Sequence, residues 1–137
     1  MKNRQQLLRF GLVGGVNTAL DFGLLFLFKS LGLPVITSNI ISTSVAFCFS
    51  FFANKKFTFK TTDTNIKREI ALFIAVTLFG LWVLQTVVIQ VVSASLGSTG
   101  LSPDIILLIA KLVATIVSLV WNYVLYALVV FPSKPQQ

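Results

Sequence analysis

The sequence is poor in the residues that carry most protein chemistry. It has no histidine, a single cysteine and only four acidic residues among 137, so 11% of the chain is charged. The lack of histidine excludes histidine-based catalysis and leaves little basis for a zinc or iron site, and Cys48 alone cannot form an intrachain disulfide. There is no Walker A loop, no G-x-G-x-x-G segment and no carboxylate pair placed for acid–base work. We therefore expect neither an enzyme nor a cofactor.

Apolar residues are what the sequence has in abundance. They make up 55% of the chain, and the mean hydropathy is +0.89. A soluble domain of this size has too little interior to hide so much apolar surface. Crossing a bilayer core of about 30 Å takes roughly 20 residues. The runs predict an all-α membrane protein, a single transmembrane domain over residues 1–137, with four transmembrane helices at about 8–28, 34–53, 70–95 and 104–131.

The basic residues are distributed unevenly around these spans. The end with Lys29 carries no other cation, whereas nine lie on the opposite side: Lys2, Arg4, Arg9, Lys55, Lys56, Lys60, Lys67, Arg68 and Lys134. The positive-inside rule therefore predicts that both termini and the middle loop are cytoplasmic. The net charge of +7 comes mostly from basic residues that flank the membrane runs and act as topology signals. We therefore expect no nucleic-acid partner. The basic start runs into apolar sequence without a cleavage site, which favours a retained first helix.

The two halves of the chain resemble each other at an offset of 72 residues. Residues 43–59 align with 115–131, so that Thr43 meets Thr115 and Phe59 meets Phe131. Each half also has a polar stripe stepping by three or four, as on one helical face: Asn39, Thr43, Ala46, Ser50 and Asn54 in one, Lys111, Thr115, Ser118, Asn122 and Tyr126 in the other. This predicts two hairpins repeated in parallel.

Charged and polar residues also stand inside the predicted spans. A charge near a helix centre costs about 2.5–3.5 kcal/mol on insertion scales and is usually paired or functional. Asp21 and Lys111 lie at matching depth, roughly 10 Å from the outer ends, and Asn39 lies near that level. Two compatible interpretations follow: a structural ion pair, or a hydrophilic pocket for a polar substrate. On the first helix Asn17 shares a face with Asp21 and Gly14, although small residues there also suit helix packing.

Cations cluster where the first two helices end on the cytoplasmic side. Arg9, Lys55 and Lys56 stand there. They either anchor the chain to anionic lipid, at about 1 kcal/mol each, or capture a particular phosphate by charge-assisted hydrogen bonds. Together with the polar stripe from Asn54 to Asn39, these cations are typical of the entrance to a polar path through the membrane.

Several stretches resemble the GtrA-like family of small four-helix membrane proteins. They are "RFGLVGGVNTALDF" at 9–22, "FSFFANKKFTF" at 49–59, "KREIALF" at 67–73 and "NYVLYALVVF" at 122–131. The resemblance implies a multi-pass protein of the bacterial inner membrane. It implies translocation of a polyprenyl-phosphate-linked monosaccharide to the outer leaflet, where a separate glycosyltransferase uses it for cell-surface polysaccharide modification.

Position by position, the resemblance covers Arg9, Asn17, Asp21, Asn54, Lys55, Lys56 and Asn122. In the role it implies, the substrate phosphate meets Arg9, Lys55 and Lys56, and the sugar hydroxyls meet Asn17, Asp21, Asn39 and Asn122. Lys111 holds Asp21 or receives the phosphate at the outer level. The last span departs from the family pattern, because Ala127 and Leu128 stand where a basic residue usually precedes the final aromatic. The departure argues against a phosphate contact there.

Two other functions fit parts of the sequence. A small proton-coupled multidrug exporter would use Asp21 to bind organic cations, although Lys111 at matching depth would oppose a cation. A non-transporting adaptor would recruit a glycosyltransferase through the basic and aromatic loop 55–69. Because four helices form a thin bundle, too narrow to enclose a sugar comfortably, we also expect a homo-oligomer, most simply a dimer.

Overall fold

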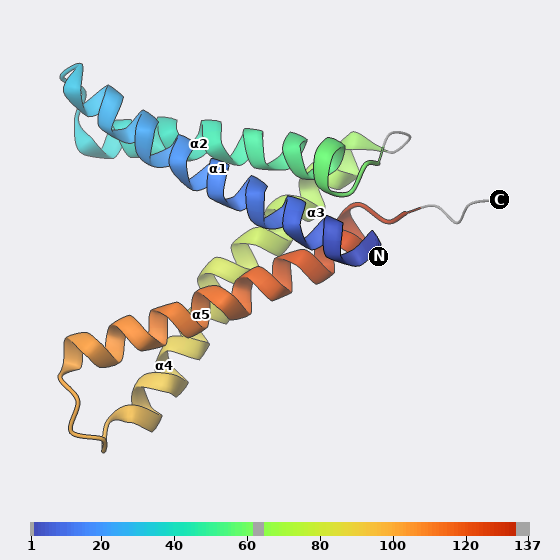
Figure 1. The fold of residues 1–137 in the computed structure, drawn as a ribbon. Helices are drawn as coiled ribbons and strands as arrows, with labels where there is room; N and C mark the ends of the chain where they lie inside the picture. Colours follow the sequence, from blue (N-terminus) through green and yellow to red (C-terminus); the bar gives the residue numbers. More distant parts are fainter. Residues whose placement is uncertain (1, 62–64, 134–137) are drawn as a thin grey trace. The chain divides into compact units, whose positions relative to one another are not determined.

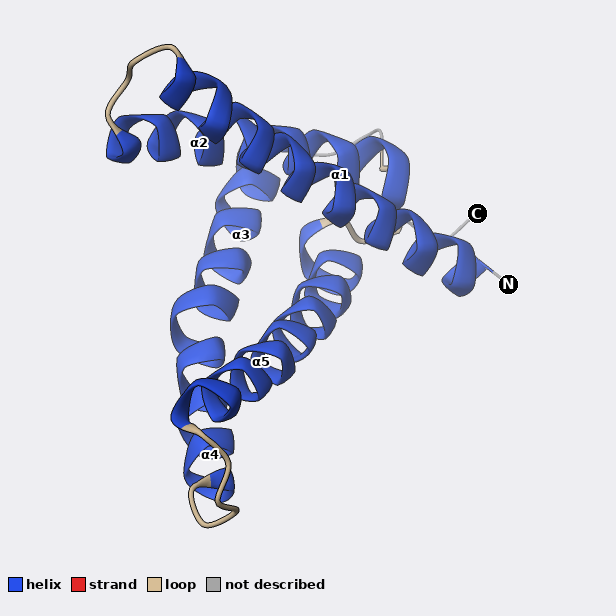
Figure 2. Ribbon diagram, turned by 60° about the vertical axis from the view of Figure 1, so that its left-hand side comes forward, coloured by secondary structure: helices blue, strands red, loops and turns tan. Residues whose placement is uncertain are grey.

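The computed structural model describes residues 2–61 and 65–133, and within these ranges every regular element is helical. Figures 1 and 2 show the helices and the short loops that join them. In chain order the elements are α1 (Lys2–Ser30), α2 (Val35–Ala53), the π-helical turn η1 (Asn54–Thr58), α3 (Ile66–Leu78), the π-helical turn η2 (Phe79–Leu84), α4 (Gln85–Leu96), α5 (Pro103–Leu125) and the π-helical turn η3 (Tyr126–Val130).

Four of the helical rods are long and apolar enough to cross a membrane. They are Arg4–Ser30, Val35–Thr58, Ile66–Leu96 and Pro103–Val130. The four predicted spans are thus confirmed, within five residues at every end. Large apolar side chains lie exposed along the described parts of the rods, as expected of helices that face lipid: for example Leu8, Ile36, Trp82 and Leu128. The cytoplasmic placement of the termini stays a prediction, and Lys134, counted toward it, lies outside the described residues.

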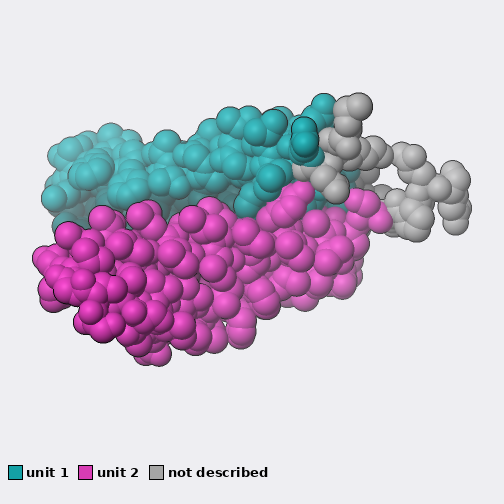
Figure 3. All heavy atoms as spheres, turned by 60° about the horizontal axis from the view of Figure 1, so that its bottom comes forward, with its two compact units in different colours: residues 1–64 teal, residues 65–137 magenta. Residues whose placement is uncertain are grey.

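The chain divides into two compact units, residues 1–64 and residues 65–137 (Figure 3). In unit 1, α1 and α2 run side by side in opposite directions (Figure 1), and η1 continues α2. In unit 2, α3, η2 and α4 form one continuous rod that packs on α5 and η3. Each unit is therefore a helical hairpin, and the division falls between the two hairpins that the sequence predicts. A single domain over the whole chain stays a prediction.

The hairpin turns follow from local chemistry. α1 ends in a Schellman motif, in which the Leu33 N–H donates to Phe28 O and the Gly32 N–H donates to Lys29 O, both at 3.1 Å. Gly32 supplies the left-handed backbone that this cap requires, with φ of 94°. Pro34 then stops the first helix and precedes the second. At the other hairpin the Ser102 side chain accepts from the Ile105 N–H at 3.4 Å, with Pro103 in the first helical position.

Two of the three π-helical turns occupy equivalent positions in the two hairpins. Asn54–Thr58 and Tyr126–Val130 are 72 residues apart, the offset at which the sequence halves align. Each turn is closed by the amide of the following phenylalanine: Phe59 N donates to Asn54 O at 2.8 Å, and Phe131 N donates to Tyr126 O at 2.7 Å. Because π-helical residues are rare, this coincidence supports an internal duplication.

The buried faces repeat at the same offset. Ser38, Ser42 and Ala46 on α2 are at most 3% exposed, and their counterparts Ala110, Ala114 and Ser118 on α5 are at most 4% exposed. Small residues let helices approach closely in a membrane. Each hairpin therefore presents one close-packed row of small residues on its second helix.

Candidate functional site

The intramembrane carboxylate of unit 1 lies between its two spans. Asp21 is half-buried, and the Thr43 hydroxyl of α2 lies 3.5 Å from Asp21 Oδ1, a long hydrogen bond. One turn earlier on α1, Asn17 is also half-buried, and its Oδ1 is buried without a hydrogen-bond partner in the described part of the chain. The hydroxyl of Thr18 instead returns to the backbone, donating to Gly14 O at 2.9 Å. Asp21 and Asn17 thus keep hydrogen-bonding capacity within a membrane span.

The other two residues predicted at the level of Asp21 are exposed. Asp21 lies nine residues before the end of α1, and Lys111 lies eight residues after the start of α5. At 1.5 Å per residue, they lie about 13 Å and 12 Å from those helix ends. The side chains of Lys111 and Asn39 are both exposed. On α2 it is the neighbouring Ser38 that is fully buried. A pair between Asp21 and Lys111 would join the two units, and it stays a prediction.

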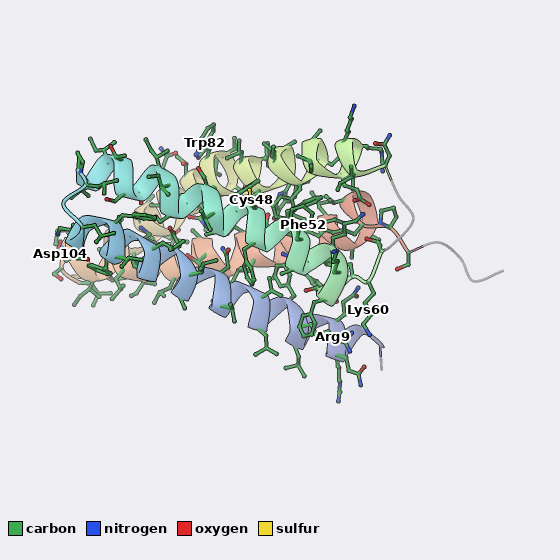
Figure 4. All side chains as sticks on the ribbon, turned by 90° about the horizontal axis from the view of Figure 1, so that it is seen from above. Arg9, Cys48, Phe52, Lys60, Trp82 and Asp104 are labelled. Atoms are coloured by element: carbon green, nitrogen blue, oxygen red, sulfur yellow. The ribbon has the colours of Figure 1, made fainter. Side chains whose placement is uncertain are left out.

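Cations gather at the end of unit 1 that holds the N-terminus. Arg9 is half-buried, and its guanidinium carbon lies 5.5 Å from the centre of the Phe57 ring, a cation–π distance. Lys60 lies at the same end (Figure 4), while Lys55 is only 8% exposed and Lys56 is exposed. α1 and η1 therefore bring Arg9 into the same region as the Lys55–Lys56 pair. The phosphate site expected there stays a prediction.

Buried polar atoms without partners are concentrated in residues 54–61. Asn54 is held by its amide nitrogen, which donates to Ser50 O at 2.8 Å and to Ser50 Oγ at 3.2 Å. Its Oδ1, Thr58 Oγ1 and Thr61 Oγ1 are all buried, and none of the three has a hydrogen-bond partner among the residues that the structure describes. The chain turns back here, since the Thr61 N–H donates to Lys55 O at 3.0 Å. Thr58 and Thr61 were not among the predicted site residues.

Unit 2 carries polar contacts between its two spans that the sequence analysis missed. Gln85 Nε2 donates to Ser118 Oγ at 2.8 Å, and the hydroxyls of Thr77 and Tyr126 share a hydrogen bond. The Trp121 indole N–H donates to Val76 O at 3.1 Å, close to the start of η2. An amide inside an otherwise apolar run, as at Gln85, is the signal that points to such a contact.

Asn122, the predicted site residue of α5, faces the α3–α4 rod. It is half-buried, and its Oδ1 has no hydrogen-bond partner within the described ranges. Gly80 makes room for it, because a Cβ at this position would lie 3.2 Å from Asn122 Oδ1 and 3.1 Å from Trp121 Cδ1. The glycine therefore permits a close approach of the two spans beside a polar side chain.

The end of α5 is closed by aromatic rings. Tyr126 stacks on Phe73 with ring centres 4.7 Å apart, and Phe131 lies 6.2 Å from Tyr126 and 6.3 Å from Phe73. The three side chains are at most 3% exposed. This cluster stands where the first hairpin has Asn54 and its polar neighbours.

The fold and these polar groups define a class: a small multi-pass helical membrane protein with hydrogen-bonding side chains inside its spans. The model of the family described as "GtrA/DPMS, transmembrane domain" matches residues 9–131. The chain therefore belongs to this family, and is a membrane protein of the polyprenyl-phosphate sugar translocation family. A comparison with curated proteins finds no match.

Proposed function

We propose that the protein moves a polyprenyl-phosphate-linked monosaccharide from the cytoplasmic to the outer leaflet of a bacterial inner membrane, where a glycosyltransferase takes it up. It does no covalent chemistry in this role. The observation that carries the proposal is the set of polar side chains left with free hydrogen-bonding capacity inside apolar spans: Asn17, Asp21, Asn54 and Asn122.

Such groups are costly unless something binds them. Leaving a buried donor or acceptor unpaired costs about 1–3 kcal/mol, and a membrane offers no water in its core to relieve that cost. Sugar hydroxyls both donate and accept, so they suit the amide oxygens of Asn17 and Asn54 and the carboxylate of Asp21. The isoprenoid tail stays in hydrocarbon throughout.

The phosphate needs cations where the substrate enters. Arg9, Lys55 and Lys56 supply them at one end of unit 1, and charge-assisted hydrogen bonds to phosphate are roughly twice as strong as neutral ones. At the outer level, the exposed Lys111 of α5 serves as the counter-charge of the arriving phosphate. We also propose that the protein works as a homodimer.

The test is sugar accessibility in proteoliposomes, with an impermeant sugar-modifying probe that reports movement between leaflets. Wild type is compared with Asp21→Ala, and Asp104→Ala is the matched control, because Asp104 is an exposed carboxylate in the first turn of α5. We expect wild type and the control to equilibrate the lipid-linked sugar and Asp21→Ala to lose at least tenfold in rate.

Two other results would count against this. If Asp21→Ala works as well as wild type, Asp21 is not part of the path. If neither protein moves the lipid, transport itself is wrong and the recruitment of a glycosyltransferase takes its place.

A further inference from the structure

The second helix of each hairpin ends in a π-helical turn of the same length, but the two turns carry different side chains. At the offset of 72 residues, the turns Asn54–Thr58 and Tyr126–Val130 coincide, and each is followed by a buried phenylalanine. Asn54 stands in the place of Tyr126, and Thr58 in the place of Val130. The shared backbone makes these positions directly comparable.

In the second hairpin this position holds Tyr126, whose ring is packed and whose hydroxyl is hydrogen-bonded. The ring of Tyr126 stacks on Phe73, and its hydroxyl is bonded to Thr77. Val130 is fully buried and has no polar side-chain atom to satisfy. Among the described residues, the turn Tyr126–Val130 therefore has no unpaired side-chain polar atom of its own, and Ala127 and Leu128 bring no positive charge to it.

In the first hairpin the same position holds polar groups that no atom of the described residues satisfies. Asn54, Thr58 and Thr61 are 2%, 3% and 7% exposed, and the side-chain oxygen of each is without a hydrogen-bond partner in the part of the chain described. Packing alone does not require them, because the second hairpin closes the same turn with an aromatic ring and a valine. Three such atoms within eight residues indicate a binding role.

We propose that residues 54–61 form the headgroup site for a glycosyl phosphate, and that the equivalent turn of the second hairpin, Tyr126–Val130, is purely structural. The proposal rests on the proposed function and assigns its recognition step. The hydroxyls of Thr58 and Thr61 donate to phosphate oxygens, and positive charge at this end comes from Arg9, which lies over the Phe57 ring, and from Lys55 of the same turn. Burial excludes water from these hydroxyls, which strengthens the hydrogen bonds they make with a ligand.

Asn54 recognises a different part of the ligand. Its amide nitrogen is already committed to Ser50, so the side chain presents a fixed Oδ1, which only accepts hydrogen bonds. An ionised phosphate has no hydrogen to donate, whereas a sugar hydroxyl has one. Asn54 therefore distinguishes the glycosylated lipid from the bare lipid phosphate, while Thr58 and Thr61 serve both.

The experiment measures binding to the full chain in nanodiscs, with two probes: undecaprenyl phosphate bearing a single glucose, and bare undecaprenyl phosphate. Thr58→Val copies the residue that the second hairpin carries at Val130, and Thr61→Val removes the other hydroxyl. We expect each to weaken both lipids about tenfold. Asn54→Ala should leave bare-phosphate binding within twofold and remove at least a fivefold preference for the glucosyl lipid.

Two controls separate recognition from folding. Thr58→Ser retains the hydroxyl and should bind within twofold of wild type. Thr86→Val removes an exposed hydroxyl that donates to Trp82 O in unit 2, and it should change nothing.

The outcomes are distinct. If wild type binds the glucosyl lipid and all three variants bind it equally well, the site is wrong and the proposed function stands. If Asn54→Ala weakens both probes alike, the assignment of Asn54 to the sugar is overturned. If wild type binds neither probe, this site and the proposed function both fail.

Discussion

The two hairpins share a backbone plan, yet their spans are held together differently. Unit 2 ties its spans with side chains: the Gln85–Ser118 and Thr77–Tyr126 hydrogen bonds, the indole of Trp121 on Val76 O, and the aromatic cluster at Tyr126. Between α1 and α2 of unit 1, the hydroxyl of Thr43 makes a long contact of 3.5 Å with Asp21 Oδ1. Five side-chain oxygens of unit 1 are buried without a hydrogen-bond partner in the described part of the chain: those of Asn17, Ser38, Asn54, Thr58 and Thr61.

This difference indicates a division of labour between the two hairpins. Interhelical hydrogen bonds in membranes contribute about 0.6 kcal/mol each on average, so unit 2 gains stability from several small terms. Unit 1 forgoes those terms at Asn17, Asn54 and Thr58. A site that must bind and release a polar ligand cannot also satisfy its own polar groups permanently.

The comparison is tested most strongly at the equivalent positions Tyr126 and Asn54. Tyr126→Ala removes the stacking on Phe73 and the hydrogen bond to Thr77, so we expect it to lower the free energy of unfolding by about 3 kcal/mol. Asn54→Ala loses two hydrogen bonds to Ser50 but also removes an unpaired oxygen, so its loss should stay below about 1 kcal/mol. Reversible unfolding in mixed micelles measures both, and equal losses would contradict the division of labour.

A smaller effect is expected at the glycines. Gly80→Val places new atoms against Trp121 and Asn122, where a Cβ alone would lie 3.1 and 3.2 Å from its neighbours, and should cost about 1–3 kcal/mol by overpacking. In unit 1, a Cβ at Gly14 would meet nothing within 4 Å, so Gly14→Val should be neutral within about 0.5 kcal/mol. Thermal unfolding in the same detergent gives the difference, and a neutral Gly80→Val would show that the two spans do not need this close approach.

The smallest effect concerns the polar tie between α4 and α5. Gln85→Leu removes the hydrogen bond to Ser118, and we expect a loss of about 0.6 kcal/mol. The exposed Gln90 is the matched control, because Gln90→Leu changes the same side chain in the same span without breaking a contact that the structure describes. If the two variants unfold alike, the Gln85–Ser118 bond adds nothing to stability.

The four spans were predictable because long apolar runs, separated by polar or glycine- and proline-containing loops, are visible in the sequence itself. The repeat was predictable because residues of the two halves match at an offset of 72. The proximity of Arg9 to the turn with Asn54 and Lys55 was predictable from the sequence as well, because these residues belong to the recognisable stretches at 9–22 and 49–59. Their role in a site stays a prediction. Thr58 and Thr61 were missed because a threonine near a membrane boundary is common. Only the comparison of Thr58 with Val130 at the offset of 72 makes it conspicuous.

Which residues are buried at the outer ends of the spans was harder to predict, because the buried face of a helix that crosses its neighbour at an angle winds around the helix. The predicted stripe from Asn39 to Asn54 mixes steps of three and four and stays on one side of the helix. The buried residues instead step by four, from Ser38 through Ser42 and Ala46. Each such step drifts about 40° around an α-helix, so the row wraps as it follows a neighbour that crosses at an angle. Asn39 therefore ends up exposed, and Lys111 does so at the equivalent place on α5.

The positions of the three π-helical turns bear on how the two hairpins are related. Such a turn is a helix that has accepted one additional residue, and η1 and η3 hold it at corresponding positions. A single ancestral hairpin that already contained the extra residue would account for both turns, and in an internal duplication the insertion would then precede the doubling. The turn η2 has no counterpart in α1, which is regular from Lys2 to Ser30. The third turn is therefore particular to the second hairpin, whose rod of α3, η2 and α4 also carries Thr77 and Gln85, the partners of Tyr126 and Ser118.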